Sequence, residues 1–230
     1  MAKRGKKYNQ SIKSVDKEKL YAPDEAVKLV KEVAYASFDE SIEIHVNLGV
    51  DPKHSDQNIR GTTMLPHGIG QETRVAVVTQ GEAVDAALKA GADEVGGEDL
   101  VQKIQGGWLD FDVLIASPDM MAKLGKLGKL LGGRGLMPSP KNGTVTPNVP
   151  KAVEEFKAGK LEYKNDKYGV IHMVIGKKSF EDAKLIENMK ALYGVLLKVK
   201  PTKVKGTYFK SIVLASSMGP GVKVDPLEVG

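Results

Sequence analysis

Apolar and polar residues alternate strictly over residues 42–48, which is the pattern of a strand that buries one face. A proline followed by two acids at 23–25 predicts a helix start before this strand, because proline suits the first helical turn and acids suit the positive end of the helix dipole. After the strand, Asp51-Pro52 predicts a break. A polar loop through Asn58 and a second extended segment to about Leu65 follow.

The pattern changes at Pro66-His67-Gly68-Ile69-Gly70, which marks a boundary. Beyond it, a short continuous apolar run at 75–78 and an apolar strand pattern at 111–116 alternate with helical patterns at 82–89 and about 98–104. Strands that alternate with helices predict a parallel sheet covered on both faces. Residues 68–159 are therefore predicted to form a small Rossmann-like insert.

After Ala158-Gly159 the earlier pattern returns. It predicts a strand at 170–175, an amphipathic helix at 180–196 and a final strand at 208–214. The apolar face of that helix is expected to comprise Ala183, Ile186, Met189 and Tyr193. The predicted fold class is α/β with two domains. A discontinuous α+β sandwich of two helices and four strands is built from residues 1–67 and 160–230, and the Rossmann-like domain is inserted between them.

Composition removes several classes of protein. Cysteine is absent, which excludes disulfides, thiolate metal sites and cysteine nucleophiles. No stretch approaches the roughly 20 apolar residues that span a bilayer, and the basic N-terminus lacks the apolar core of a secretory signal. We therefore expect a cytoplasmic protein without a membrane partner.

Charge is distributed unevenly along the chain. Residues 1–67 carry 11 Lys and Arg against 10 Asp and Glu, residues 68–159 carry 10 against 12, and residues 160–230 carry 13 against 7. A nucleic-acid footprint would lie on the outer segments, although the lysines could simply solvate helix faces. The first 19 residues form a basic arm, either loose until it meets RNA or a plain disordered terminus.

The residues that common enzymes require are missing from the insert. Gly128-Lys129 is followed by Leu130, where a phosphate-binding loop needs Ser or Thr, and Gln80-Gly81-Glu82 places an acid where a phosphate would approach. The four histidines lack ligand spacing, and His45 and His172 are better explained as solvent-facing or hydrogen-bonded strand residues than as metal ligands. The pairs Asp93-Glu94 and Glu98-Asp99 are better explained as solvated helix ends than as catalytic carboxylates. We expect no catalytic activity, no cofactor and no metal.

A loop rich in glycine, leucine and basic residues is expected at 123–135. Its backbone amides and basic side chains could approach a phosphate backbone closely. It could equally be a glycine-rich packing segment at the rim of the insert, since its leucines suggest that part of it is anchored. The sequence leaves both interpretations open.

Three stretches, 51–61, 134–145 and 211–220, together with 38–40 and 165–167, resemble the family of bacterial large-subunit ribosomal protein one (ribosomal protein L-one) over essentially the whole chain. The resemblance implies a discontinuous first domain with a second domain inserted. It implies binding to the rRNA of the mobile stalk beside the tRNA exit site, a role in releasing deacylated tRNA, and repression of the protein's own mRNA. The implied partners are large-subunit rRNA, exit-site tRNA and its own operon mRNA, with the protein a monomer within the ribosome.

The same resemblance indicates which residues contact RNA in the first domain. Serine hydroxyls can donate and accept hydrogen bonds, a glycine lets backbone approach ribose, large apolar side chains can pack on a sugar or base, and a lysine can meet phosphate. Core packing is the alternative for the phenylalanine and the methionine, and simple solvent exposure is the alternative for the serines. The residues are Phe38, Ser41, Lys167, Ser211, Ser217, Met218 and Gly219.

Two rival functions remain open at this point. A nucleotide-dependent enzyme could use the Rossmann-like insert. A free RNA-binding repressor or chaperone could share the same RNA surface without entering the ribosome.

Overall fold

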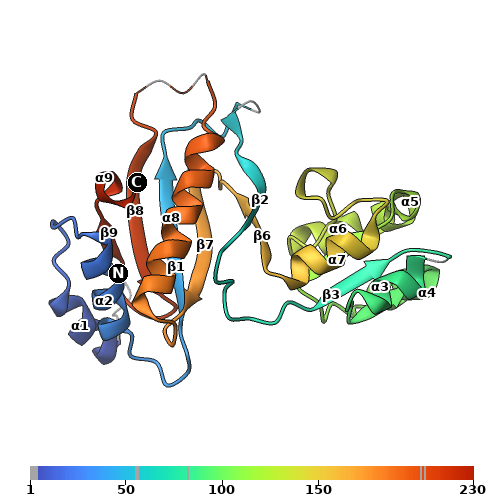
Figure 1. Cartoon of the computed structure of the whole chain (residues 1–230), viewed down its shortest axis with the longest axis horizontal. Coiled ribbons are helices and arrows are strands. Elements are labelled where there is room, and N and C mark those ends of the chain that lie inside the picture. The colour runs from blue at the N-terminus through green and yellow to red at the C-terminus, as the bar shows by residue number, and fades with distance from the viewer. Residues whose placement is uncertain (1–4, 55–56, 82, 203, 205) are drawn as a thin grey trace. The chain divides into compact units, whose positions relative to one another are not determined.

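The computed structural model describes residues 5–54, 57–81, 83–202, 204 and 206–230. The chain divides into two compact units, the first made of residues 1–70 and 163–230 and the second of residues 71–162 (Figure 1). Both units contain helices and strands, in agreement with the α/β class. Within the described residues, no helix is long and apolar enough to cross a membrane.

The first unit is built on a four-stranded sheet in the order β7-β1-β8-β9, with every neighbouring pair antiparallel. Its strands are β1 (Ser41–Leu48), β7 (Val170–Lys177), β8 (Phe209–Ser216) and β9 (Val222–Val224). Helices α2 (Pro23–Val33) and α8 (Asp182–Lys198) pack against each other and against one face of this sheet (Figure 1). The helix and strand predicted from residues 23–48 are confirmed.

Alternation along the strands decides which face the helices cover. In β1 the even-numbered residues from Ile42 to Leu48 are at most 2% exposed, whereas the odd-numbered residues from Ser41 to Asn47 are half-buried. Residues in register on β7, β8 and β9 follow the same alternation, since paired residues of an antiparallel sheet point to the same side. We call the side opposite the two helices the open face.

The buried face of α8 differs from the predicted one. Its fully covered residues are Leu185, Asn188, Met189, Leu192 and Leu196. Of the four expected residues only Met189 is fully buried, and Ala183 is exposed.

The buried face of α8 includes a polar residue, Asn188, among its leucines. The Asn188 amide oxygen accepts from the His67 amide at 3.1 Å, and its nitrogen donates to the carbonyls of Gly68 and Ile175 at 3.0 and 2.8 Å. These bonds offset the cost of burying a polar side chain.

Several short elements of the first unit, and β6 at its boundary with the second, escaped prediction. They are α1 (Lys6–Ser11), the 3-10 turn η1 (Ile12–Ser14), α9 (Pro226–Val229), β9 and β6 (Lys160–Lys164), and β6 forms a two-stranded sheet with β2 (Arg60–Met64). The expectation of a loose arm is wrong for residues 6–14, and residues 1–4 of that arm lie outside the described part. Such elements span too few residues to establish a period.

The second unit contains a three-stranded parallel sheet in the order β4-β3-β5. Its strands are β3 (Val75–Val78), β4 (Glu94–Gly96) and β5 (Val113–Ala116). Its longer helices are α3 (Ala83–Lys89), α4 (Glu98–Gln105) and α7 (Val149–Lys157). The predicted helix began at Glu82, which lies outside the described residues. All four residues of β3 are fully buried, so the prediction of a sheet covered on both faces is confirmed, whereas β4 had not been predicted.

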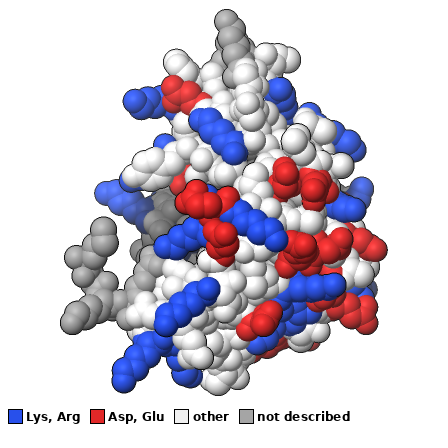
Figure 2. Space-filling view, turned by 90° about the vertical axis from the view of Figure 1, so that its left-hand side faces the viewer, with Lys and Arg blue, Asp and Glu red and all other residues white. Residues whose placement is uncertain are grey.

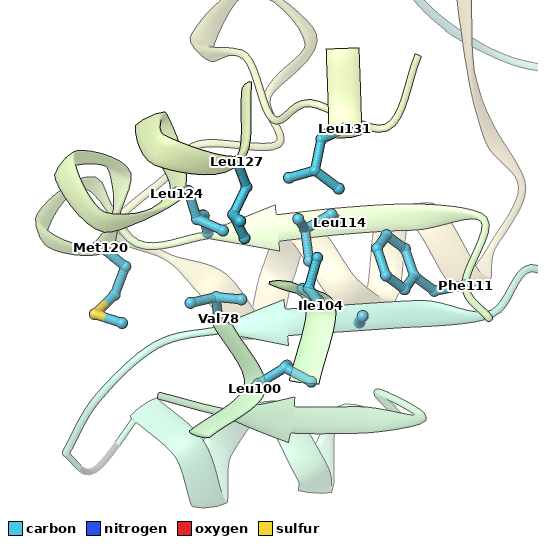
Figure 3. Close-up of a cluster of buried hydrophobic side chains, with 11 residues drawn as sticks. Val78, Leu100, Ile104, Phe111, Leu114, Met120, Leu124, Leu127 and Leu131 are labelled. Atoms are coloured by element: carbon cyan, nitrogen blue, oxygen red, sulfur yellow. The ribbon is translucent and has the colours of Figure 1, made fainter. Parts of the chain in front are cut away.

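The segment 123–135 is mostly helical, so the expectation of a loop is wrong. It contains the end of α5 (Met121–Leu124), the 3-10 turn η4 (Gly125–Leu127) and α6 (Gly128–Gly133). Leu124, Leu127 and Leu131 point into the core beside β5 (Figure 3), while Lys126 and Lys129 are exposed. The leucines anchor the segment as the packing interpretation requires, and an RNA contact of its lysines remains a prediction. The remaining 3-10 turns of this unit are η3 (Pro118–Met120) and η5 (Pro140–Asn142).

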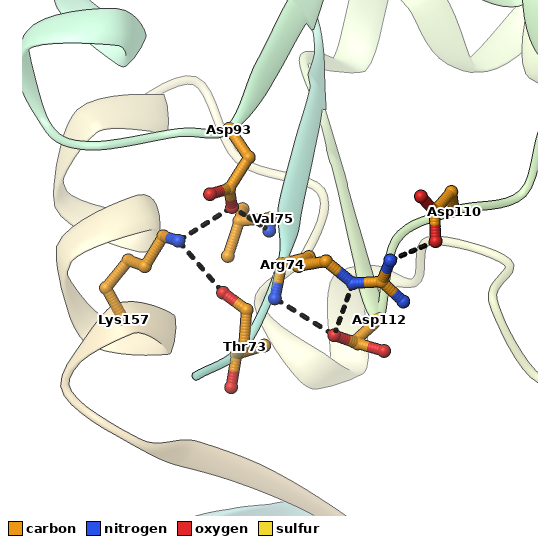
Figure 4. Close-up of polar contacts among 7 residues, drawn as sticks. All are labelled: Thr73, Arg74, Val75, Asp93, Asp110, Asp112 and Lys157. Carbon is orange, nitrogen blue, oxygen red and sulfur yellow. Dashed lines mark hydrogen bonds and ion pairs between the residues drawn. The ribbon is translucent and has the colours of Figure 1, made fainter. Parts of the chain in front are cut away.

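Ion pairs hold the chain where it begins and ends the second unit (Figure 4). Lys157 Nζ lies 2.6 Å from Asp93 Oδ2 and donates to the Thr73 carbonyl at 2.9 Å, and the same Asp93 oxygen accepts from the Val75 amide. The Arg74 guanidinium contacts Asp110 and Asp112. Asp93 is therefore an ion-paired residue just before β4. It is solvated as expected, with its side chain 44% exposed, but it does not lie at a helix end.

Candidate RNA interface

Five of the seven predicted contact residues, which we call the rim cluster, gather at one end of the first unit's sheet. Ser41 begins β1 and residues 217–219 follow β8, and antiparallel pairing of Ile42 with Ser216 brings these ends together. The Ser217 amide donates to the Ser41 carbonyl at 3.1 Å, and the Ser41 amide donates to Ser217 Oγ at 3.1 Å. The rim cluster comprises Phe38, Ser41, Ser217, Met218 and Gly219.

A buried carboxylate, Glu40, connects the two loops of the rim cluster. Its side chain is completely covered, and it accepts hydrogen bonds from the amides of Ala36 at 2.7 Å and Met218 at 3.0 Å. Burial raises the pKa of Glu40, but the Ala36 amide, the Ser216 hydroxyl, the Met218 amide and the charge of Lys178 together lower it below its ordinary value. Glu40 is therefore ionised in the folded protein and fixes the backbone on either side of it.

Sequence reasoning missed Glu40, although a signal was present. Position 40 lies two residues before Ile42, in phase with the buried side of β1. An acid in a buried phase must find hydrogen-bond donors, because an unpaired buried carboxylate costs several kcal/mol. This combination indicates a carboxylate with a structural role beside the site.

The two large apolar side chains of the rim cluster are exposed. Phe38 is 55% and Met218 is 51% exposed, so the core-packing alternative for both residues is wrong. The loop carrying Phe38 is anchored at its neighbour Asp39, which accepts from the amide and the hydroxyl of Ser179 at 3.1 and 2.7 Å. A phenyl ring and a thioether are thus held in solvent beside serine hydroxyls, on backbone that is fixed from beneath.

Gly219 has a packing reason to be glycine. A Cβ at this position would lie 2.5 Å from Ser216 Oγ, which accepts a hydrogen bond from the Gly219 amide at 3.1 Å. A side chain here would therefore force the Ser216 hydroxyl to move and would disturb this hydrogen bond. The absence of a side chain also leaves the backbone of the turn accessible to a partner.

The other two predicted residues, Ser211 and Lys167, lie at the opposite end of the sheet. Ser211 pairs with Asn47 near the end of β1, and it lies six residue steps along the extended chain from Ser217, a span of about 20 Å. Lys167 is exposed in the turn between β6 and β7, beside the ring of Tyr168. It borders a cleft of about 420 Å³ lined by Pro52, Asn58, Lys164, Asn165, Asp166 and Lys167.

The open face lies between these two ends. Ser41, Glu43, His45 and Asn47 alternate along β1 on this face, and His172 lies across from His45 on β7. The prediction that both histidines are solvent-facing or hydrogen-bonded strand residues is confirmed, since their Nδ1 atoms lie 2.9 Å apart. Over the described residues, no group of three or more His, Asp or Glu is arranged to hold a metal ion.

Positive charge near the rim cluster comes from two lysines on β7 and the turn after it. Lys177 Nζ donates to Ser41 Oγ at 3.0 Å, and Lys178 Nζ donates to the Ala34 carbonyl at 2.8 Å. On the side where α1, α2 and β9 lie, basic and acidic side chains are interspersed (Figure 2). The site therefore offers a few hydroxyls, apolar groups and lysines at fixed positions on the first unit. The side shown in Figure 2 has no broad basic patch.

A comparison with known families identifies the family of this chain. A model of the ribosomal protein L1p/L10e family matches residues 30–220, which include every residue of the rim cluster together with Ser211 and Lys167. The chain therefore belongs to the ribosomal protein L1p/L10e family and is a structural protein of the ribosome in the cytoplasm, where it binds large-subunit rRNA.

Proposed function

We propose that this protein binds the rRNA of the mobile stalk beside the tRNA exit site, assists the release of deacylated tRNA, and represses translation of its own mRNA by binding an rRNA-like site. The proposal assigns RNA binding to a domain of residues 1–67 and 160–230, and it assigns residues 68–159 to an inserted domain. The protein acts as a monomer within the ribosome, without catalysis or cofactor.

The rim cluster carries this proposal. An aromatic ring and a thioether that stay exposed on rigid backbone can pack on sugars or bases without first being ordered, so less conformational entropy is lost on binding. The neighbouring hydroxyls of Ser41 and Ser217 can donate to phosphate or pair with ribose 2′-hydroxyls. Ser211 and Lys167 extend the same surface across the open face.

Binding of a stalk rRNA fragment to single variants of the full chain tests the surface. Met218→Ala and Ser217→Ala are each expected to weaken binding by about 1–3 kcal/mol, the range for a lost apolar contact or hydrogen bond. Leu227→Ala is the matched control, because Leu227 is an equally large apolar side chain, 87% exposed, on α9. Full affinity in both rim variants would refute the proposed surface.

A lysine pair tests the opposite end of the surface. Lys167→Ala is expected to reduce the salt dependence of binding by about one counterion if Lys167 contacts a phosphate. Lys89→Ala, at the end of α3 in the second unit, should leave the salt dependence unchanged. An equal effect of both substitutions would show that Lys167 contributes only bulk charge.

Release of tRNA and repression need separate assays. Ribosomes lacking the protein are expected to retain deacylated tRNA longer after translocation than ribosomes to which it has been restored. Translation of the protein's own mRNA should fall when the protein is added and recover when stalk rRNA competes for it. Failure to sediment with large subunits would favour a free RNA-binding protein, and a thermal shift with nucleotides would favour an enzyme.

A further inference from the structure

Two imidazoles face each other in the middle of the open face. His45 on β1 is in register with His172 on β7, their ring centroids are 5.0 Å apart, and their Nδ1 atoms are 2.9 Å apart. At that distance one nitrogen must donate and the other must accept, so a single hydrogen lies between the rings. The observed geometry therefore accommodates at most one positive charge on the pair.

Carboxylates lie at the outer nitrogens of both rings. Glu43 Oε2 is 3.9 Å from His45 Nε2, and Asp166 Oδ2 is 3.6 Å from His172 Nε2. The same row of the sheet continues through Val213 on β8 to Lys223 on β9, and α2 and α8 pack on the opposite side. Glu43, Asp166 and the more distant Lys223 are the charged groups that face the histidine pair. With both rings neutral, the two histidines and the two carboxylates together carry two negative charges.

An RNA that contacts both the rim cluster and Ser211 must cross this row, because the two lie at opposite ends of one strand. The carboxylates would repel its phosphates unless the histidine pair is protonated, and a nearby phosphate favours the charged form of an imidazole. We propose that the His45–His172 pair is a proton-uptake site of the RNA surface, at which binding of RNA adds one proton and thereby ties affinity for RNA to pH. This inference rests on the proposed RNA surface and adds one chemical condition for RNA binding there, which is protonation of the histidine pair.

The free protein starts from a state that favours a neutral His45. Burial, together with the facing His172, lowers the pKa of His45, and Glu43 opposes this change. RNA would raise the pKa of the pair, so the gain in affinity is full at low pH and is lost as pH rises through the pKa of the bound state. Each unit by which RNA raises the pKa strengthens binding of the protonated form by about tenfold.

Calorimetric titration of the stalk rRNA fragment into the full-length protein tests the inference. Measurements at pH 7 in two buffers of different ionisation enthalpy give the number of protons taken up, and we expect up to one. Between pH 8 and 6, at constant ionic strength, affinity should increase by about three- to tenfold. Proton uptake and the pH dependence of affinity should both diminish in His45→Asn and in His172→Asn, because a neutral side-chain amide then replaces the titratable imidazole.

Controls separate this inference from the proposed function. His67→Asn should retain the uptake, since His67 pairs with Glu187 of α8, the helix that packs on the side of the sheet opposite the open face. His172 is 53% exposed, so its replacement can be tested even if the His45 variant is unstable. No uptake by the wild type, or uptake in both variants equal to that of the wild type, overturns the inference while leaving rRNA binding intact. No binding at any pH would instead overturn the proposed RNA surface.

Discussion

Replacing Glu40 tests whether a buried carboxylate builds the rim cluster. In Glu40→Ala the amides of Ala36 and Met218 lose their acceptor, and each partly buried donor left unpaired costs about 1–3 kcal/mol. Since both amides are near the surface and water can reach them in part, we expect a total loss of about 2–4 kcal/mol in the free energy of unfolding of the first unit. Affinity for the stalk rRNA should fall as well, because Phe38 and Met218 lose their fixed backbone.

Amide hydrogen exchange is the decisive assay, because the chain has two units and its unfolding need not be a single transition. Exchange at Ala36 and Met218 should accelerate in Glu40→Ala and in the neutral Glu40→Gln. Glu181→Gln, which replaces a carboxylate that is 75% exposed, is the control. Unchanged protection of both amides in Glu40→Ala would refute the structural role of this carboxylate.

The direction of the pH dependence follows from the lowered pKa of Glu40. A carboxylate whose pKa is lower in the folded than in the unfolded protein contributes stability above its unfolded pKa. That contribution is lost as pH falls through the folded pKa. Stability of the first unit in the wild type should therefore fall more steeply below pH 4.5 than in Glu40→Gln, with 4.5 being the ordinary value for this group.

Three further substitutions test the packing and the ion pairs. Leu131→Ala should destabilise the second unit by about 2–5 kcal/mol because Leu131 is fully buried. The fluorescence of Trp108, which packs on the same core, would report the unfolding. Lys126→Ala is the control and should change stability by less than about 0.5 kcal/mol. Asn188→Ala should cost about 2–4 kcal/mol, since it strands one amide and two carbonyls, and exchange at the His67 amide should accelerate. Lys157→Ala should lower the free energy of unfolding by no more than about 1 kcal/mol, because its ion pair with Asp93 is partly exposed, and by less in high salt. A loss of several kcal/mol in urea denaturation would contradict this expectation.

The elements that the sequence determined are those with enough residues to establish a period. β1 shows strict alternation over eight residues, and the buried β3 shows an uninterrupted apolar run. In both strands the apolar pattern directly predicts which residues are buried, because a strand must bury its apolar side. Short pieces such as α1, β4 and β9 carry no comparable signal.

The tertiary structure decided how distant residues combine. Pairing of β1 with β8 joins residues 41 and 217 into one rim and separates them from Ser211, which no local pattern states. Pairing of β1 with β7 places His45 against His172, although each alone looked like an ordinary strand residue. Glu40 and Asn188 are polar residues whose burial depends on donors and acceptors from other segments. Side-chain chemistry is written in the sequence, but hydrogen-bond partners across a sheet are set by register, which only the folded chain fixes.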